Sequence, residues 1–192
     1  GLSAAGKMTG TPPPVTVRSH AWNVDFIGAS SGALIIPDKP LPTYNNYFIG
    51  SNPSKWAAEC KIYQGVTIKN VYPGVDVRYY TDRGTLKYDI LVQPGADPSR
   101  IALKYDGVDK IQVKNKELVV STSLADFKES APFTFQPSVT GRAVVNCKYT
   151  VSGNVVRFDI KEYDRTRQLV IDPSIVFCSF SGSRSDNWGF TA

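Results

Sequence analysis

Short runs in which apolar and polar residues alternate constrain the fold of this chain more than any other feature. Val75, Val77 and Tyr79 take every second position of one run, and residues 101–105 repeat the pattern. Such a period of two places alternate side chains on one face of a β-strand. No apolar period near 3.6 persists for three turns. The pattern therefore predicts half-buried strands and little helix.

Further strands are predicted where β-branched and aromatic residues gather between turn signals. Those ranges are 22–27, 85–92, 111–113, 118–121, 144–151, 155–160 and 169–171. Two helical turns are expected at Asn52–Trp56 and Asp97–Arg100, since each has a capping side chain directly before a proline. Many short strands joined by tight turns predict an all-β fold, an antiparallel β-sandwich with short helical turns.

The predicted core comes from the apolar phases of the strongest strands. We expect it to be formed mainly by Val77, Tyr79, Leu86, Tyr88, Ile90, Ile101, Leu103, Phe158, Ile160, Val170 and Ile171.

Chain length and composition suggest how the chain is divided. Its 192 residues suit one sandwich domain. Residues 1–14 are small and rich in proline and glycine, which indicates a linker or tail, so the sandwich is assigned to residues 15–173. Pro173 has no amide hydrogen for a strand ladder, and alternation resumes after Ser174, so residues 174–192 are predicted to begin another domain. We expect residues beyond Gly182 to pack poorly on the sandwich.

The net charge of +5 does not indicate a nucleic-acid site. The densest basic group lies between Lys104 and Lys116 but is interleaved with acidic residues, which favours a solvated sheet face. No segment is apolar for long enough to cross a membrane. The chain begins without an initiator methionine or a hydrophobic signal region, so the loss of a secretion signal remains open.

Catalytic and metal-binding chemistry finds little support in the residue pattern. His20 is the single histidine, which excludes mechanisms that need two imidazoles and the common His-rich zinc sites. No GxSxG elbow, phosphate-cradling glycine loop or calcium-loop ligand string is present, and most aspartates lie in turns. We therefore expect no catalytic residues, no cofactor and no metal.

Three cysteines, Cys60, Cys147 and Cys178, form no metal-ligand spacing. Two arrangements remain open: one disulfide with one free thiol, or three free thiols. Cys147 shares a strand phase with Val145 and Tyr149, which favours a packed core thiol.

The aromatic residues suggest one binding hypothesis. A platform for sugar rings would use Trp22, Tyr44, Tyr47, Trp56 and Trp188, with the amides of Asn45 and Asn46 reading hydroxyl groups. Aromatics at strand positions more often fill cores, and core packing is the favoured interpretation. Two coplanar exposed tryptophan rings would support the sugar platform.

Four motifs, in order, resemble a known family. They are NYFIGSNPSKW, VTIKNVYPGVDVRYY, LKYDILVQPGADPSRIALKYDGV and LVIDPSIVFCSFSG. Together they resemble the all-β domain found N-terminal to SBBP-type β-propeller repeats in large secreted bacterial proteins. The last residues, SFSGSRSDNWGFTA, look like the entry to a first propeller repeat and are similar to Bacteroidetes members with type IX secretion or gliding-motility domains.

The resemblance implies a non-catalytic structural or interaction module of a larger secreted or cell-surface protein. Its partners would be other domains of the same polypeptide or cell-surface components, in an extracellular setting such as adhesion. The alternative is a carbohydrate-binding or glycan-processing domain that uses the exposed aromatics. In the family motif YNNYFIGSNPSKW we expect a strand, a glycine turn and a helical turn that seats Trp56 on the core.

Overall fold

The computed structural model describes residues 18–176, and in this part the fold is all-β, as predicted. Every strand pairing is antiparallel, the sheets do not close into a barrel, and two 3-10 turns, η1 (Pro53–Lys55) and η2 (Pro98–Arg100), are the helical elements of this part. The strands are β1 (Asn23–Phe26), β2 (Leu34–Tyr47), β3 (Ala57–Tyr72), β4 (Val75–Asp82), β5 (Thr85–Val92), β6 (Leu103–Asp106), β7 (Lys110–Lys114), β8 (Glu117–Ser121), β9 (Asp126–Glu129), β10 (Phe133–Ser138), β11 (Gly141–Val145), β12 (Cys147–Ser152), β13 (Val155–Ile160), β14 (Leu169–Asp172) and β15 (Ile175–Val176).

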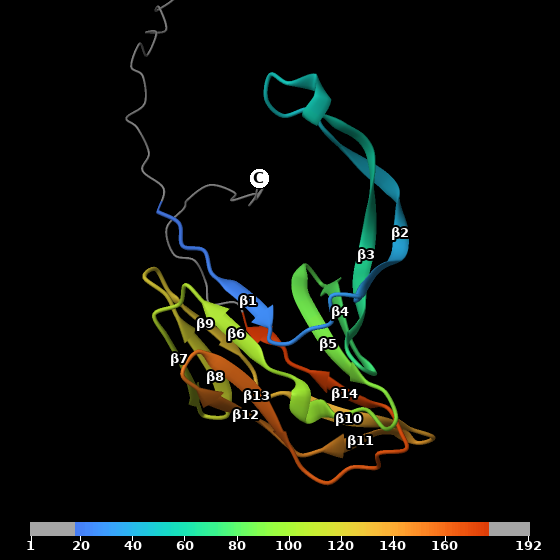
Figure 1. The fold of residues 1–192 in the computed structure, drawn as a ribbon, viewed down its shortest axis with the longest axis vertical. Helices are drawn as coiled ribbons and strands as arrows, with labels where there is room; N and C mark the ends of the chain where they lie inside the picture. Colours follow the sequence, from blue (N-terminus) through green and yellow to red (C-terminus); the bar gives the residue numbers. More distant parts are fainter. Residues whose placement is uncertain (1–17, 177–192) are drawn as a thin grey trace, which may run out of the picture.

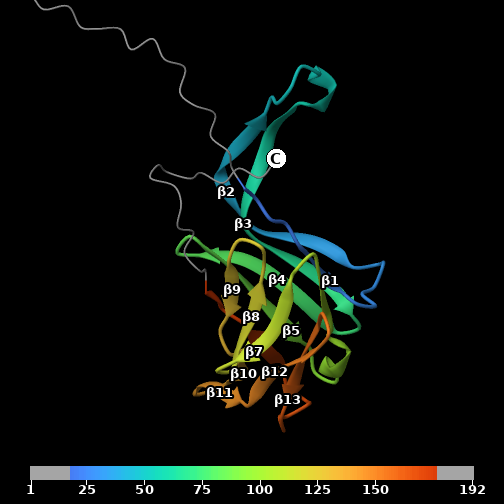
Figure 2. The same ribbon diagram turned by 90° about the vertical axis from the view of Figure 1, so that its left-hand side faces the viewer.

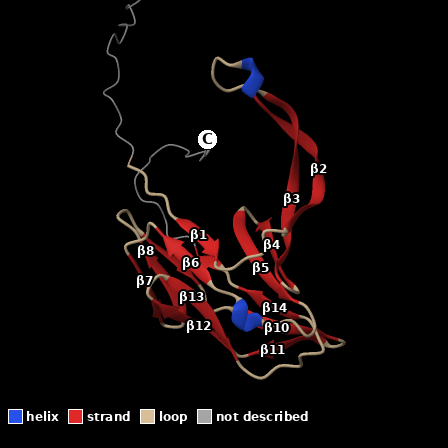
Figure 3. Cartoon of the chain, viewed as in Figure 1, coloured by secondary structure: helices blue, strands red, loops and turns tan. Residues whose placement is uncertain are grey.

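These strands form three sheets. The largest has the order β11-β10-β14-β5-β4-β3-β2. Two four-stranded sheets, β1-β6-β13-β12 and β15-β9-β8-β7, lie opposite one part of it, as the views in Figure 1 and Figure 3 show. The result is an open sandwich in which the large sheet reaches beyond the two smaller ones.

The core fills the space between the sheets. From the large sheet Val77 and Ile90 are fully buried, and Leu103, Leu118 and Val156 meet them from the smaller sheets. Burial alternates along β5, β6 and β13, as a period of two predicts, whereas consecutive residues are buried in β4 and β8. Most of the predicted core residues are buried here, but Leu86 is 53% exposed, because it lies near the start of β5, next to the turn from β4.

One predicted strand proves to be two. The run 144–151 was expected to be continuous, but Asn146 separates β11 from β12. β11 pairs with β10 in the large sheet, whereas β12 pairs with β13 in a small one. The chain therefore turns a corner between sheets at Asn146, a change that alternation alone does not reveal.

Both helical turns were predicted correctly. The side chain of Asn52 accepts a hydrogen bond from the Ser54 amide at 3.0 Å, and Asp97 does the same for Ser99. The second cap leaves a carboxylate in two hydrogen bonds with Ser99, which lower the pKa of Asp97.

β2 and β3 form a long hairpin that projects from the sandwich and is called the arm here (Figure 2). Their pairing is the most extensive in the described fold, with register shifts between Pro40 and Tyr44 and between Asn45 and Tyr47. Such irregularities bend a hairpin and raise its twist. The arm continues the large sheet without a second layer facing its outer half.

An ion pair fastens the base of the arm to the body. Arg78 of β4 reaches over β3 to Asp38 of β2, at 2.6 Å. Gly65 lies between them on β3, and a Cβ there would come within 2.9 Å of the Tyr79 carbonyl oxygen. A glycine at this point therefore lets the guanidinium cross the strand and lets the strands approach closely.

The two cysteines of the described part, Cys60 and Cys147, are free. Cys178 lies outside it. Burial raises the pKa of the Cys147 thiol, so less of it is thiolate at a given pH.

We expect alkylation in denaturant without reductant to label three cysteines, as detected by mass spectrometry. In the folded protein, Cys147 should react more slowly than it does after unfolding, because it is partly buried and thiolate-poor. A single added label in denaturant would demonstrate a disulfide and contradict the prediction.

Candidate functional site

The tip of the arm carries most of the residues of the sugar-platform hypothesis. Trp56 follows η1 and is 43% exposed, so its predicted place on the core is wrong. Its indole N–H donates to the Gly50 carbonyl at 3.1 Å, and its ring meets Phe48 edge-on with centroids 5.6 Å apart. The ring is therefore held by residues of the tip itself, and Figure 1 shows that the tip lies at the end of the arm away from the sandwich.

Tyr44 and Tyr47, from the same hypothesis, are also exposed on the arm, which corrects the favoured expectation that they fill a core. The two amides serve the hairpin. Asn46 accepts from the Glu59 amide at 2.8 Å, where β3 has a positive φ and the register shifts, and Asn45 donates to the Tyr47 hydroxyl. The amides thus stabilise an irregular hairpin.

The described tryptophans do not form a shared platform. Trp22 is half-buried beside β1, where it packs on Phe127 with ring centroids 4.4 Å apart. Trp56 lies at the tip of the arm. Trp188 is outside the described residues. Two coplanar exposed rings are therefore not found between residues 18 and 176.

His20 makes a hydrogen bond at each ring nitrogen. Its Nε2 lies 2.7 Å from the Gly107 carbonyl, and its Nδ1 lies 2.9 Å from the Ser123 hydroxyl. Because a carbonyl only accepts, Nε2 carries a proton and donates to Gly107, and in the neutral ring Nδ1 then accepts from the Ser123 hydroxyl. The ring thus ties the approach to β1 to two loops.

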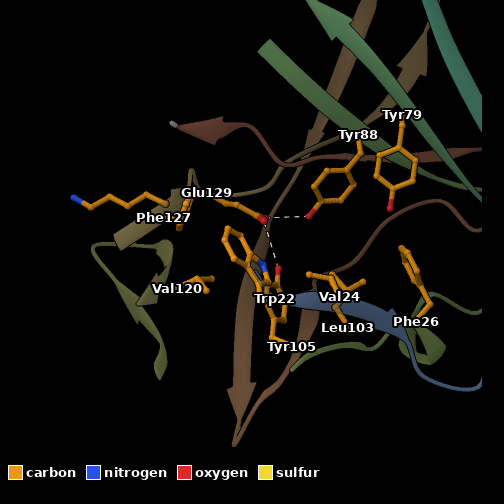
Figure 4. Close-up of a pocket in the computed structure, with 11 residues that line it drawn as sticks. Trp22, Val24, Phe26, Tyr79, Tyr88, Leu103, Tyr105, Val120, Phe127 and Glu129 are labelled. Carbon is orange, nitrogen blue, oxygen red and sulfur yellow. Dashed lines mark hydrogen bonds between the residues drawn. The ribbon is translucent and has the colours of Figure 1, made fainter. Parts of the chain in front are cut away.

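A cavity of about 220 Å³, partly open to solvent, lies where the three sheets meet (Figure 4). Trp22, directly before β1, forms one wall with Val24 and Phe26 of β1, and the large sheet supplies Tyr79 and Tyr88. The remaining walls come from β6, β8 and β9, through Leu103, Tyr105, Val120, Phe127, Lys128 and Glu129. The lining is therefore mainly aromatic and aliphatic, with one carboxylate.

The Glu129 carboxylate is surrounded by tyrosine hydroxyls. Tyr88 donates to Oε2 at 3.0 Å and Tyr105 to Oε1 at 3.4 Å, and both bonds are visible in Figure 4. The Tyr149 hydroxyl lies 3.2 Å from Oε2 and 3.1 Å from the Ser130 carbonyl. No ion pair to Glu129 occurs within residues 18–174. This residue was not predicted from the sequence.

Burial raises the pKa of Glu129, and the tyrosine hydrogen bonds oppose that shift only in part. Burial also raises the pKa of Tyr79, Tyr88 and Tyr105, with the nearby Glu129 carboxylate as the second cause, so these phenols stay protonated. The carboxyl group of Glu129 is therefore surrounded by neutral phenol donors.

The raised pKa predicts a pH dependence of folding. Below the ordinary carboxyl value of 4.5 Glu129 is protonated in both states, and above it the unfolded chain loses the proton first. The stabilisation is thus present at acidic pH and is lost as pH rises through the raised folded-state pKa. The stability of wild type relative to Glu129→Gln should fall as pH rises above the ordinary carboxyl value of 4.5 and should level off above the raised folded-state pKa.

Urea unfolding at several pH values measures this difference. Asp126→Asn removes an exposed carboxylate from the same strand and serves as the control. A difference between wild type and Glu129→Gln that stays flat with pH would contradict the prediction.

Among residues 18–176, no group of three or more histidine, cysteine, aspartate or glutamate side chains is placed to hold a metal ion. The same part of the chain contains no helix that is long and apolar enough to span a membrane.

The fold and its sites thus define an all-β, open-sandwich domain with a projecting arm and an aromatic cavity. The chain belongs to the family described as "Domain of unknown function (DUF7948)", whose model matches residues 3–174. No curated protein and no solved structure shows a significant match to the chain.

Proposed function

We propose that this domain is a non-catalytic interaction module that uses the tip of the arm to bind an apolar surface of another protein domain. The observation that carries the proposal is the exposure of large apolar side chains on an element that leaves the sandwich. At the tip these are Phe48, Ile49 (69% exposed) and Trp56, with Tyr44 and Tyr47 behind them. Contiguous exposed apolar surface commonly marks interaction sites.

The tip is also pre-organised. Asn52 caps η1. The Trp56 indole N–H donates a hydrogen bond to the Gly50 carbonyl, and the indole ring packs against Phe48. Aromatic side chains held in this way lose little conformational entropy on binding, which is why such residues often dominate interface energies.

The face of the arm is a better binding surface than its edge. β2 is the last strand of its sheet, and its three prolines, Pro37, Pro40 and Pro42, lack the amide hydrogens that a further strand would need. Prolines and bulges on an edge strand oppose pairing with other chains. Side-chain contacts at the tip therefore suit the proposal more than strand addition.

The resemblance to domains that precede SBBP-type propeller repeats supports the wider setting. On that basis we place the module in a larger secreted or cell-surface protein, with adjoining domains of the same polypeptide or cell-surface components as partners. Sugar binding has less support, since the two arm amides are engaged within the hairpin and the described tryptophans lie apart.

The proposal is tested by site-specific photo-crosslinking in the full-length protein in its native cells. A photoreactive phenylalanine analogue at Ile49 should give a defined protein adduct. The same analogue at Val139 should give none, because this fully exposed apolar residue lies on the body between β10 and β11.

A Trp56→Ser change should reduce the Ile49 adduct by about tenfold or more, as expected for loss of a binding hot spot. Its melting temperature should stay close to that of wild type, because the ring is half-exposed and remote from the core. Equal adducts at Ile49 and Val139, or no adduct at Ile49, would overturn the proposal. An adduct to a second copy alone would replace it with self-association.

A further inference from the structure

The cavity between the three sheets has features that the proposed role of the arm does not use. It lies beside β1, β4 and β9, whereas the interaction surface is at the far end of β2 and β3. We infer that this cavity is a binding site for a small organic cation, a primary ammonium carried on a compact apolar body.

Size and lining define the apolar part of the ligand. The volume of about 220 Å³ exceeds the roughly 150 Å³ of a protein cavity known to take up benzene. Trp22 and Phe26 lie on one wall and Tyr79 lies on the wall formed by the large sheet, so that a ring or short branched chain entering the cavity meets aromatic surfaces. One six-membered ring with a one-carbon linker matches this space.

The carboxylate defines the charged part. Glu129 lines the cavity and is surrounded by phenols, with no basic partner in residues 18–174. Lys128 also lines the cavity, but strand alternation directs its side chain to the opposite face of β9 from Glu129, and no ion pair joins the two. A cation is the ligand that compensates a partly buried carboxylate whose neighbours are neutral hydroxyl donors.

Unused acceptor capacity favours a group with several N–H donors. Within residues 18–176, Glu129 Oε1 receives one long hydrogen bond, 3.4 Å from Tyr105, although a carboxylate oxygen has two lone pairs. Figure 4 shows the Tyr79 hydroxyl directed toward the space between Val24 and Phe26. It adds a further polar group to the cavity lining. A primary ammonium supplies three donors, and the aromatic faces add cation–π attraction.

The test uses three probes of one shape: benzylamine, benzyl alcohol and benzoate. Binding to the full 192-residue chain is followed by the NMR chemical-shift changes of the Trp22 indole N–H and the Glu129 amide. Benzylamine should bind at least about tenfold more tightly than benzyl alcohol, which corresponds to one ion-pair or cation–π contribution, and benzoate should not bind.

Two variants locate the site. Glu129→Gln should weaken benzylamine about tenfold and leave benzyl alcohol unchanged, whereas Asp126→Asn, on the same strand and exposed, should change neither. Val24→Phe adds volume at a half-exposed wall position and should abolish binding of both probes while the protein stays folded.

Equal affinities for benzylamine and benzyl alcohol would show a merely apolar cavity and overturn the inference. Absence of binding, or shifts at the Trp56 indole in place of Trp22, would overturn it too. Neither result affects the proposed role of the arm, whose test depends on Ile49 and Trp56.

Discussion

Replacing Phe158 with alanine is expected to lower the free energy of unfolding by about 3 to 5 kcal/mol. Phe158 is 8% exposed in β13, directly opposite Tyr149 of β12, with ring centroids 5.6 Å apart. The truncation removes buried apolar surface, and the rigid strand pair around it cannot collapse to fill the space.

Urea unfolding of Phe158→Ala measures the loss, with Leu86→Ala as its control. Leu86 is also an apolar strand residue but is largely exposed, so its truncation should cost less than about 1 kcal/mol. Similar losses in the two variants would mean that the core does not lie between the sheets as described.

Replacing Gly74 with alanine should have the second large effect, about 2 to 5 kcal/mol. Gly74 joins β3 to β4 with φ +71°, a conformation that costs a residue with a side chain about 1 to 2 kcal/mol. A Cβ there would also come within 2.8 Å of the Ala96 Cβ, which adds a packing clash.

The two costs can be separated by thermal or urea unfolding. Gly84→Ala is the matched control, since Gly84 has φ +79° but no atom within 4 Å of the added Cβ, and it should show the backbone cost alone. Combining Gly74→Ala with Ala96→Gly should remove the clash, so that only the cost of the backbone conformation remains. If Gly74→Ala costs no more than Gly84→Ala, the close contact with Ala96 is not as described.

Local sequence patterns were sufficient to predict most strands of the sandwich. The runs 85–92 and 155–160 match β5 and β13 at both ends, because alternation and the flanking turn residues act within a few positions of one another. The helical turns at Asn52 and Asp97 were predicted for the same reason: the cap and the proline are neighbours in sequence.

The arm shows where that reasoning ends. Residues 34–47 contain three prolines, which lower strand propensity, yet they form β2 because pairing with β3 is available at the edge of the large sheet. Trp56 and Tyr47 have the composition of core residues. Whether a second layer covers them is decided by the size of the opposing sheets, so their exposure could not be predicted.

The cavity could not be predicted from the sequence either. Glu129 and the tyrosines that surround it come from β5, β6, β9 and β12, which only the stacking of three sheets brings together. The sequence signal nearest to it is the shared phase of Phe127 and Glu129 on one strand, which places a carboxylate on an apolar face without naming its neighbours.

The sequence by itself thus determined the all-β class, the antiparallel strands, the turns and most of the buried phase, because these depend on interactions between residues close along the chain. Tertiary structure alone decided which apolar faces are covered, where the arm leaves the sandwich and which side chains surround Glu129. Those outcomes depend on contacts between distant strands, and a period of two specifies the face of a strand but not the layer that packs against it.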